Sequence, residues 1–302
     1  MESEHTQPPV CDYEGSTYQT EFWDEGGRAY EDQVEAAALK RLLPPEGGEL
    51  LLELGAGAGR NTPRYEGYRR VVLLDYSTTQ LQQARARLGD SDRYIYVAAD
   101  VYRLPFVDGL FDGATLIRVL HHLADGQAAL NQIRQAMRPG GMFILEFANK
   151  QNVKAIARYL LRRQTWSPFS PDPIEFVELN YNFHPATTRD WLQKAGFAIE
   201  RQLTVSHFRI WMLKRILPTS LLVGLDSLAQ LTGNWWQVSP SVFVKNRAVG
   251  DTPIAAPGAF FKCPQCGSSD LEEGDSILVC GGCETRWGKE GGIHNFKEAV
   301  TG

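Results

Sequence analysis

Short apolar runs alternate along the chain with segments in which apolar residues recur every three or four positions. Runs of this kind, bounded by glycine, proline or acidic residues, are typical of strands buried on both faces of a parallel sheet. They lie at 50–54, 69–75, 93–99, 111–119, 142–148, 196–205 and 239–245. The segments with helical periodicity are 31–43, 79–88, 130–137 and 187–195. Because the two kinds alternate, the pattern predicts an α/β fold with a doubly wound, mostly parallel sheet of seven strands.

The first apolar run ends in alternating glycines, Gly55, Gly57 and Gly59. Glycine is required where a Cβ atom would prevent the backbone conformation or would block the close approach of the backbone to a ligand. Such a loop aims backbone N–H groups at a ligand beyond the end of the strand. The dinucleotide pattern G-x-G-x-x-G would need glycine at position 60, where the chain has Arg60. Glu53 would also repel a pyrophosphate, so the spacing favours a cofactor with a cationic amino-acid tail.

The stretch 51–60, LLELGAGAGR, resembles motif I of the class I S-adenosyl-L-methionine (SAM) methyltransferases, in particular the type 11 group that includes ubiquinone and menaquinone biosynthesis enzymes. Further family features follow in order: an acid ending the second strand, another after the third, FD followed by paired histidines, and an RPGG turn. They are Asp75, Asp100, 111–122 and 138–141. The resemblance covers about residues 30–150. It implies a Rossmann-like fold, SAM as cofactor and methyl transfer as the activity.

Asp75 follows Gly57 by 18 residues, near the spacing at which an acid binds ribose hydroxyls in nucleotide-binding βαβ units. Its alternative role is as a helix cap, which Ser77 can also fill. The resemblance implies that Asp100 accepts a hydrogen bond from the adenine amino group and that Val101 offers its backbone N–H. The expected cofactor-binding residues are Glu53, Gly55, Ala56, Gly57, Gly59, Asp75, Tyr76, Asp100, Val101 and Arg118, the last of them beside the methionine end.

The resemblance also implies an in-line displacement, in which the protein positions two reactants and needs no nucleophile of its own. A base is required only if the acceptor is a hydroxyl, a thiol or an acidic carbon. His121 and His122 are the expected catalytic candidates, although histidines here also serve to shape the cofactor pocket or cap a helix. The N/D-P-P-Y/F motif of amino-group methylation is absent after the fourth strand, where the chain has Arg118 and Val119.

The acceptor is therefore expected to be a small molecule, lipidic or amphiphilic, methylated on oxygen or carbon. RNA is the first alternative acceptor, favoured by the basic residues in the middle of the chain and by the cysteine-rich end. The second alternative is a non-catalytic interaction module of the same fold. Intact Glu53, Asp75 and Asp100 disfavour that second alternative.

Two segments carry patterns that the family resemblance does not explain. Between 150 and 163, basic residues recur every four positions, at Lys150, Lys154, Arg158 and Arg162. We interpret them as the solvated face of an amphipathic helix, with the alternative of a lid insertion at about 150–186 that contacts an anionic substrate, RNA or a membrane surface. The apolar segment 210–236 is interpreted as core, with an exposed apolar surface as the alternative.

Beyond a linker rich in proline and alanine, at 251–259, two CxxC pairs are separated by thirteen residues. Four thiolates at this spacing predict a tetrahedral zinc site, and the region 260–302 is expected to be a zinc ribbon. The expected metal ligands are Cys263, Cys266, Cys280 and Cys283. A module of this size has too small a core, so structural Zn²⁺ would supply its folding energy. The sequence here resembles the small zinc-ribbon activator subunit of tRNA and release-factor methyltransferases.

Composition and charge further narrow the classes of function that the chain can have. The 302-residue chain has a formal net charge of −5, and its first 35 residues hold ten acids against one base. The chain lacks the dense basic patch of an obvious nucleic-acid binder. No signal-peptide pattern or membrane-spanning apolar run is found, and paired CxxC thiols favour a reducing compartment, so a cytoplasmic location is expected.

The N-terminal arm, 1–29, precedes a methyltransferase domain expected at 30–250. The arm is rich in aromatic residues, and we interpret these as packing against the domain. The alternative is a cover over the cofactor loop, with Tyr18, Arg28 and Tyr30 near the methionine carboxylate.

Overall fold

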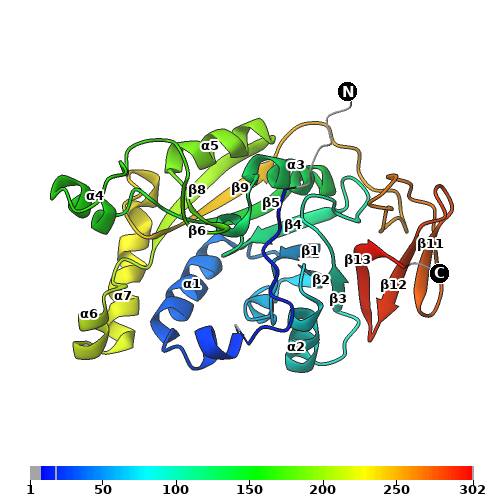
Figure 1. The fold of residues 1–302 in the computed structure, drawn as a ribbon, viewed down its shortest axis with the longest axis horizontal. Coiled ribbons are helices and arrows are strands. Elements are labelled where there is room, and N and C mark those ends of the chain that lie inside the picture. Colours follow the sequence, from blue (N-terminus) through cyan, green and yellow to red (C-terminus); the bar gives the residue numbers. More distant parts are fainter. Residues whose placement is uncertain (1–7, 18, 301–302) are drawn as a thin grey trace.

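A single sheet runs through the computed structural model, which describes residues 8–17 and 19–300 (Figure 1). The predicted α/β architecture is confirmed: the strands lie in the order β3-β2-β1-β4-β5-β9-β8, and only β9 runs against its neighbours. Their bounds are β1 (Gly48–Leu54), β2 (Tyr68–Asp75), β3 (Tyr94–Ala98), β4 (Phe111–Leu116), β5 (Met137–Ala148), β8 (Phe197–Val205) and β9 (Ser241–Ala248). The order reverses between β1 and β4, which is where open α/β sheets bind ligands.

Helices cover both faces of this sheet (Figure 1). They are α1 (Ala29–Leu42), α2 (Thr78–Leu88), α3 (Gly126–Ala136), α4 (Val153–Leu160), α5 (Pro185–Lys194), α6 (Trp211–Ile216) and α7 (Thr219–Ala229). Shorter elements are the π-helix η1 (Gln19–Asp24), the 3₁₀ turns η2 (Thr62–Arg64), η3 (Leu120–His122) and η4 (Gln230–Asn234), and the hairpin β6 (Ile174–Val177) with β7 (Asn180–Asn182).

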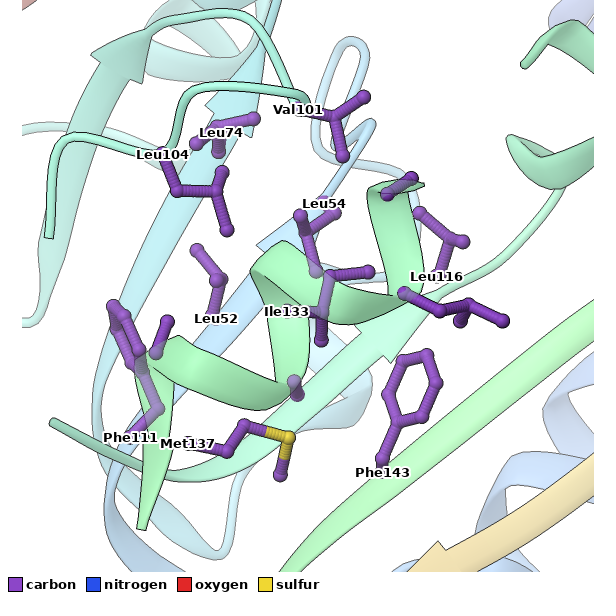
Figure 2. Packing of buried hydrophobic residues seen from close by; sticks show 14 of the residues in the cluster. Leu52, Leu54, Leu74, Val101, Leu104, Phe111, Leu116, Ile133, Met137 and Phe143 are labelled. Carbon is purple, nitrogen blue, oxygen red and sulfur yellow. The ribbon is translucent and has the colours of Figure 1, made fainter. Parts of the chain in front are cut away.

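The apolar runs fill the two faces alternately, as the geometry of a strand requires. On one face, Leu52 and Leu54 of β1 pack with Ile133 of α3, and Figure 2 shows these side chains together. On the other face, Leu51 belongs to a second cluster with Val34 of α1. Because both faces are buried, the strands read as nearly continuous apolar runs.

The cysteine-rich region continues the same sheet. Its strands β10 (Leu271–Glu273), β11 (Ile277–Cys280), β12 (Arg286–Glu290) and β13 (Ile293–Ala299) pair in an antiparallel ribbon. Strand β13 then pairs in parallel with β3, with Ile293 opposite Tyr96 and Asn295 opposite Ala98. Trp287 and Phe296 belong to the apolar cluster that contains Leu52. The ribbon is therefore an extension of the methyltransferase-like sheet in both hydrogen bonding and core.

Two interpretations of the segment between β5 and β9 were wrong in part. Lys150 is not on a basic helical face, because α4 begins at Val153 and the Lys150 side chain is 2% exposed, with Nζ donating to the carbonyl of Asp172 at 2.6 Å. The segment 210–236 is core only in part: Leu222 is buried in the cluster that contains Val34, but Trp211 is 72% exposed and Trp235 is 81% exposed. None of the helices in the described residues is long and apolar enough to span a membrane.

Candidate active site

The glycine loop follows β1 with three left-handed residues. The φ angles of Gly55, Gly57 and Gly59 are 65°, 53° and 72°, a region that side chains with a Cβ rarely adopt. A Cβ on Gly55 would lie 2.1 Å from a methyl group of Val119, whereas one on Gly57 would meet no protein atom closer than 3.8 Å. Gly57 therefore presents bare backbone to open space at the end of β1.

Asp75 ends β2 and holds this loop in place. One carboxylate oxygen accepts from the backbone N–H of Gly57 at 2.8 Å, and the other accepts from Ser77 at 2.9 Å. Burial raises the pKa of the Asp75 carboxyl, although these hydrogen bonds oppose the rise. The side chain of Ser77 caps α2 by accepting from Gln80, so Asp75 is not needed as the cap.

A pocket of about 980 Å³, part of it open to solvent, lies at the carboxyl ends of β1, β2 and β4. The expected site residues that line it are Gly55, Ala56, Gly57, Asp75, Tyr76, Val101, Arg118 and His122. Leu54, Leu74 and Ile117 supply an apolar part of the lining, as is common in pockets for small molecules. Glu53, Gly59, Asp100 and His121 are not among the lining residues.

Glu53 lies behind the loop. Its carboxylate accepts from the Thr62 hydroxyl at 2.6 Å and is 4% exposed. Burial raises the pKa of the Glu53 carboxyl to about 7, even though Thr62 and Arg60 favour the charged form. Asp100 is likewise buried and accepts from the backbone N–H of Tyr102 at 2.9 Å.

A charged cluster at one side of the pocket was missed by the sequence analysis. The guanidinium groups of Arg60 and Arg118 both pair with Glu35 of α1, at 2.7 Å in each case. Trp23 of η1 stacks over Arg60 at 3.6 Å and Arg118 at 4.7 Å. Burial would raise the pKa of the Glu35 carboxyl, but Arg118 and Arg60 hold it below its usual range.

The N-terminal arm lies over the pocket, which Val10, Tyr13 and Trp23 help to line. Glu14 of the arm accepts from the backbone N–H groups of Thr78 and Thr79 at 2.9 Å, at the beginning of α2. The arm thus covers the glycine loop, but through residues other than those expected. Tyr30 instead donates to Asp226 of α7, Arg28 stacks on Phe22, and Tyr18 is outside the described residues.

The two histidines of η3 differ in their contacts. His122 has both ring nitrogens engaged, Nδ1 with the carbonyl of Leu179 at 3.0 Å and Nε2 with the hydroxyl of Tyr13 at 3.1 Å. His121 Nδ1 is buried and has no hydrogen-bond partner among the described residues. Burial, His122, Arg118 and Arg209 keep the pKa of the His121 imidazole well below its usual value. His121 is therefore a neutral imidazole with an unused nitrogen.

The four cysteines of the ribbon converge. Their sulfur atoms all lie within 4.8 Å of one another, with Cys263 and Cys283 3.7 Å apart and Cys266 and Cys280 3.5 Å apart. Four thiolates around tetrahedral zinc, with Zn–S distances of about 2.3 Å, would have their sulfurs about 3.8 Å apart. The donor set and its spacing therefore fit the metal that the sequence predicted.

Comparisons with known proteins agree with this geometry. A family described as "Methyltransferase domain" matches residues 52–145. A demethylmenaquinone methyltransferase of Clavibacter sepedonicus is 29% identical over 181 residues, 55% of this chain and 73% of that protein. The O-methyltransferase cnsE of Penicillium expansum is 30% identical over 151 residues, covering 47% of this chain and 55% of that protein.

Solved structures show the same fold. An S-adenosylmethionine-dependent methyltransferase from Mesorhizobium loti is 25% identical with a TM-score of 0.52, covering 72% of this chain and 100% of that chain. A chain from the complex of the Haloferax volcanii Trm112 methyltransferase activator with its partner methyltransferase has a TM-score of 0.55 at 18% identity, covering 77% of this chain and 96% of that chain. The second likeness shows the fold alone.

Fold and pocket together define a Rossmann-like α/β protein with a pocket at the β1–β4 switch point, where open α/β sheets bind ligands. The glycine loop and the acid that ends β2 are the features of the class I methyltransferases. The chain is an S-adenosyl-L-methionine-dependent methyltransferase, similar to the demethylmenaquinone and ubiquinone/menaquinone biosynthesis enzymes.

Proposed function

We propose that this enzyme methylates an oxygen or an acidic carbon of a small amphiphilic acceptor, and that His121 is the base. The observation that carries the proposal is the half-buried His121 imidazole, which lies 4.0 Å between ring centroids from the pocket-lining His122 and whose Nδ1 has no hydrogen-bond partner among the described residues. The names of the relatives support the acceptor class, since they include demethylmenaquinone methyltransferases, C-methyltransferases and O-methyltransferases.

The pocket residues suggest how the cofactor is held. We assign the ribose hydroxyls to Asp75, whose oxygens each retain a lone pair after the bonds to Gly57 and Ser77. Val101, with Asp100 behind it, suits the adenine ring. The guanidinium groups of Arg118 and Arg60 suit the methionine carboxylate, because carboxylates and guanidinium groups form charge-assisted pairs. Glu53 supports the loop through Thr62 rather than contacting the cofactor.

Bound SAM supplies a methyl group made electrophilic by the sulfonium. The chain's own part is to exclude water with Trp23 and Tyr13 and to align the acceptor for in-line attack. His121 Nδ1 would accept the acceptor's proton, and bound SAM would supply the methyl group that the acceptor gains in its place. A neutral imidazole is required for this step, and the lowered pKa keeps His121 in that form; the same lowering makes it a weaker base than a histidine that titrates near pH 7.

We also propose that Cys263, Cys266, Cys280 and Cys283 bind one structural Zn²⁺ as thiolates. The convergence of their sulfur atoms supports this assignment. Buried Cys263 and Cys280 belong to the apolar cluster shared with the methyltransferase sheet. The metal would therefore stabilise the ribbon and the part of the core that the ribbon contributes.

The test is methyl transfer from radiolabelled SAM into the organic-extractable and RNA fractions of a lysate, and into demethylmenaquinol. We expect label in the organic fraction, and a loss of about 10²–10⁴ in kcat for His121→Gln with SAM affinity unchanged. The control is His184→Asn, which keeps a capping acceptor at the beginning of α5, away from the pocket.

Full activity in His121→Gln would remove the base assignment. Label in RNA that is absent from the organic fraction would replace the proposed acceptor class by the RNA alternative.

A further inference from the structure

Exposed apolar side chains gather in one part of this chain. Of the 20 large hydrophobic side chains exposed within the described residues, 17 lie between Val153 and Trp236. Among the most exposed are Leu160, Leu161, Trp211, Ile216 and Trp235. Soluble monomers rarely expose apolar side chains gathered in this way, so the cluster indicates a surface that is covered when the protein functions.

The exposed side chains of α4, α6 and Trp235–Trp236 lie at the end of the molecule opposite the ribbon. Figure 1 shows α4, α6 and α7 at that end. Lys154 of α4 donates to the carbonyl of Arg209, just before α6, at 2.6 Å. The backbone N–H of Val153 donates to Val238, which brings the Trp235–Trp236 segment beside the beginning of α4. We call α4, the following turn 161–163, α6 and Trp235–Trp236 the platform.

The platform is cationic although the chain as a whole is acidic. Residues 153–163 carry four basic side chains and no acid, and residues 211–216 carry two basic side chains and no acid, within a chain of net charge −5. Arg158, Arg162 and Arg163 are all exposed. Acids near the platform are Glu31, which pairs with Lys214, and Glu175 and Glu178 on the separate β6–β7 hairpin. The exposed face of α4 thus combines aliphatic side chains with unopposed positive charge.

We propose that the platform docks the enzyme onto an anionic lipid surface. Aliphatic side chains enter the acyl boundary, tryptophans lie at the interface, and arginines contact lipid phosphates. A second copy of the chain fits less well, because it would bring six cations against six. RNA would leave Leu160, Leu161 and Ile216 without an apolar partner, because its affinity comes mainly from phosphate contacts.

The platform adjoins the site that the proposed function uses. Arg209, whose carbonyl anchors Lys154, is one of the cations acting on His121 and lies 3.7 Å from Glu31 of α1. A surface-bound enzyme would therefore present its acceptor side near the lipid. The docking itself does not depend on methyl transfer, so it can be measured without SAM or acceptor.

The experiment is co-sedimentation of the full-length protein with vesicles of equal parts phosphatidylglycerol and phosphatidylcholine, and with phosphatidylcholine alone. We expect binding to the anionic vesicles and much weaker binding to the neutral ones. Each cation near an anionic surface contributes about a factor of five, so Arg158→Gln, Arg162→Gln, Arg163→Gln combined should weaken binding about 100-fold. Trp211→Ser combined with Trp235→Ser should also weaken vesicle binding, and this loss should be the same at low and high salt because it removes apolar contacts.

The matched control removes the same charge elsewhere, with Arg69→Gln, Arg70→Gln and Arg286→Gln, all exposed and outside the platform. Unfolding temperature and SAM affinity confirm that each variant is folded. The proposal is overturned if the two triple variants bind vesicles equally. It is also overturned if the wild type ignores vesicles while binding RNA, or while forming a dimer that Trp211→Ser disrupts. Vesicle binding with no transfer to organic-extractable acceptors would retain the docking and reject the proposed function.

Discussion

Replacing Asp75 by alanine is the most direct test of the cofactor assignment. Each Asp75 oxygen already accepts one backbone N–H group, from Gly57 or Ser77, and each keeps one lone pair for a ribose hydroxyl. A hydrogen bond to a charged group contributes about 1.5–3 kcal/mol. Losing both should cost at least about 2 kcal/mol of binding free energy, which weakens SAM binding about 30-fold or more.

Isothermal titration calorimetry with SAM measures this loss, and Asp90→Ala is the control because Asp90 is exposed outside the pocket. Alanine also frees the Gly57 N–H, so the free energy of unfolding of the ligand-free variant must be measured beside the affinity. If Asp75 only supports the glycine loop and does not bind the ribose, Asp75→Ala should lower the free energy of unfolding, and the SAM affinity of the wild type should not depend on pH through this carboxyl.

The pH dependence separates these two roles. Burial raises the pKa of the Asp75 carboxyl, so its charged form is lost at a higher pH than that of an exposed aspartate. Affinity of the wild type should therefore fall as pH decreases through this raised pKa, whereas Asp75→Ala should show no such fall. An unchanged affinity in the variant at neutral pH would refute the ribose assignment.

Two further predictions concern buried groups. With a pKa of about 7 against an ordinary value of 4.5, Glu53 contributes stability that is complete below about pH 4.5 and lost as pH rises through 7. Glu53→Gln keeps a neutral side chain at every pH. In denaturant titrations, its free energy of unfolding should match that of the wild type near pH 4.5 and exceed it by up to about 3 kcal/mol above pH 7. Equal free energies of unfolding at both pH values would contradict the buried-carboxyl argument. Metal analysis should find one zinc per chain, and Cys263→Ser should release it and lower the unfolding temperature, whereas a metal-free full-length protein from a chelator-free, reducing preparation would reject the four-thiolate site.

Local patterns were sufficient to predict the sheet and the loop. Leu51, Leu52 and Leu54 are apolar because β1 is buried on both faces, and Gly57 is glycine because its φ is positive. Asp75 could be expected from its distance along the chain, since the βαβ unit fixes where β2 ends. Each of these inferences depends on residues that are neighbours in sequence.

The remaining part of the site depends on contacts between distant residues. Glu35 and Arg118 are 83 positions apart, and Trp23 reaches them from a third element. The beginning of α4 was predictable in principle, because Asn152 caps the helix by accepting from Ala155. The exposure of Trp211 was not, since an apolar pattern is the same for a buried helix and for one that lies on a lipid surface.

The pairing of β13 with β3 has a consequence for assembly. If the ribbon were a separate chain, this parallel pairing would be a bimolecular contact, weakened by dilution and dependent on equal amounts of two proteins. Here the linker 251–259 connects the two parts, which makes the encounter intramolecular, with an effective local concentration on the order of millimolar. The ratio of ribbon to catalytic sheet is therefore fixed at synthesis. Strand β3, which would otherwise be an exposed edge open to pairing with other chains, is covered in every copy.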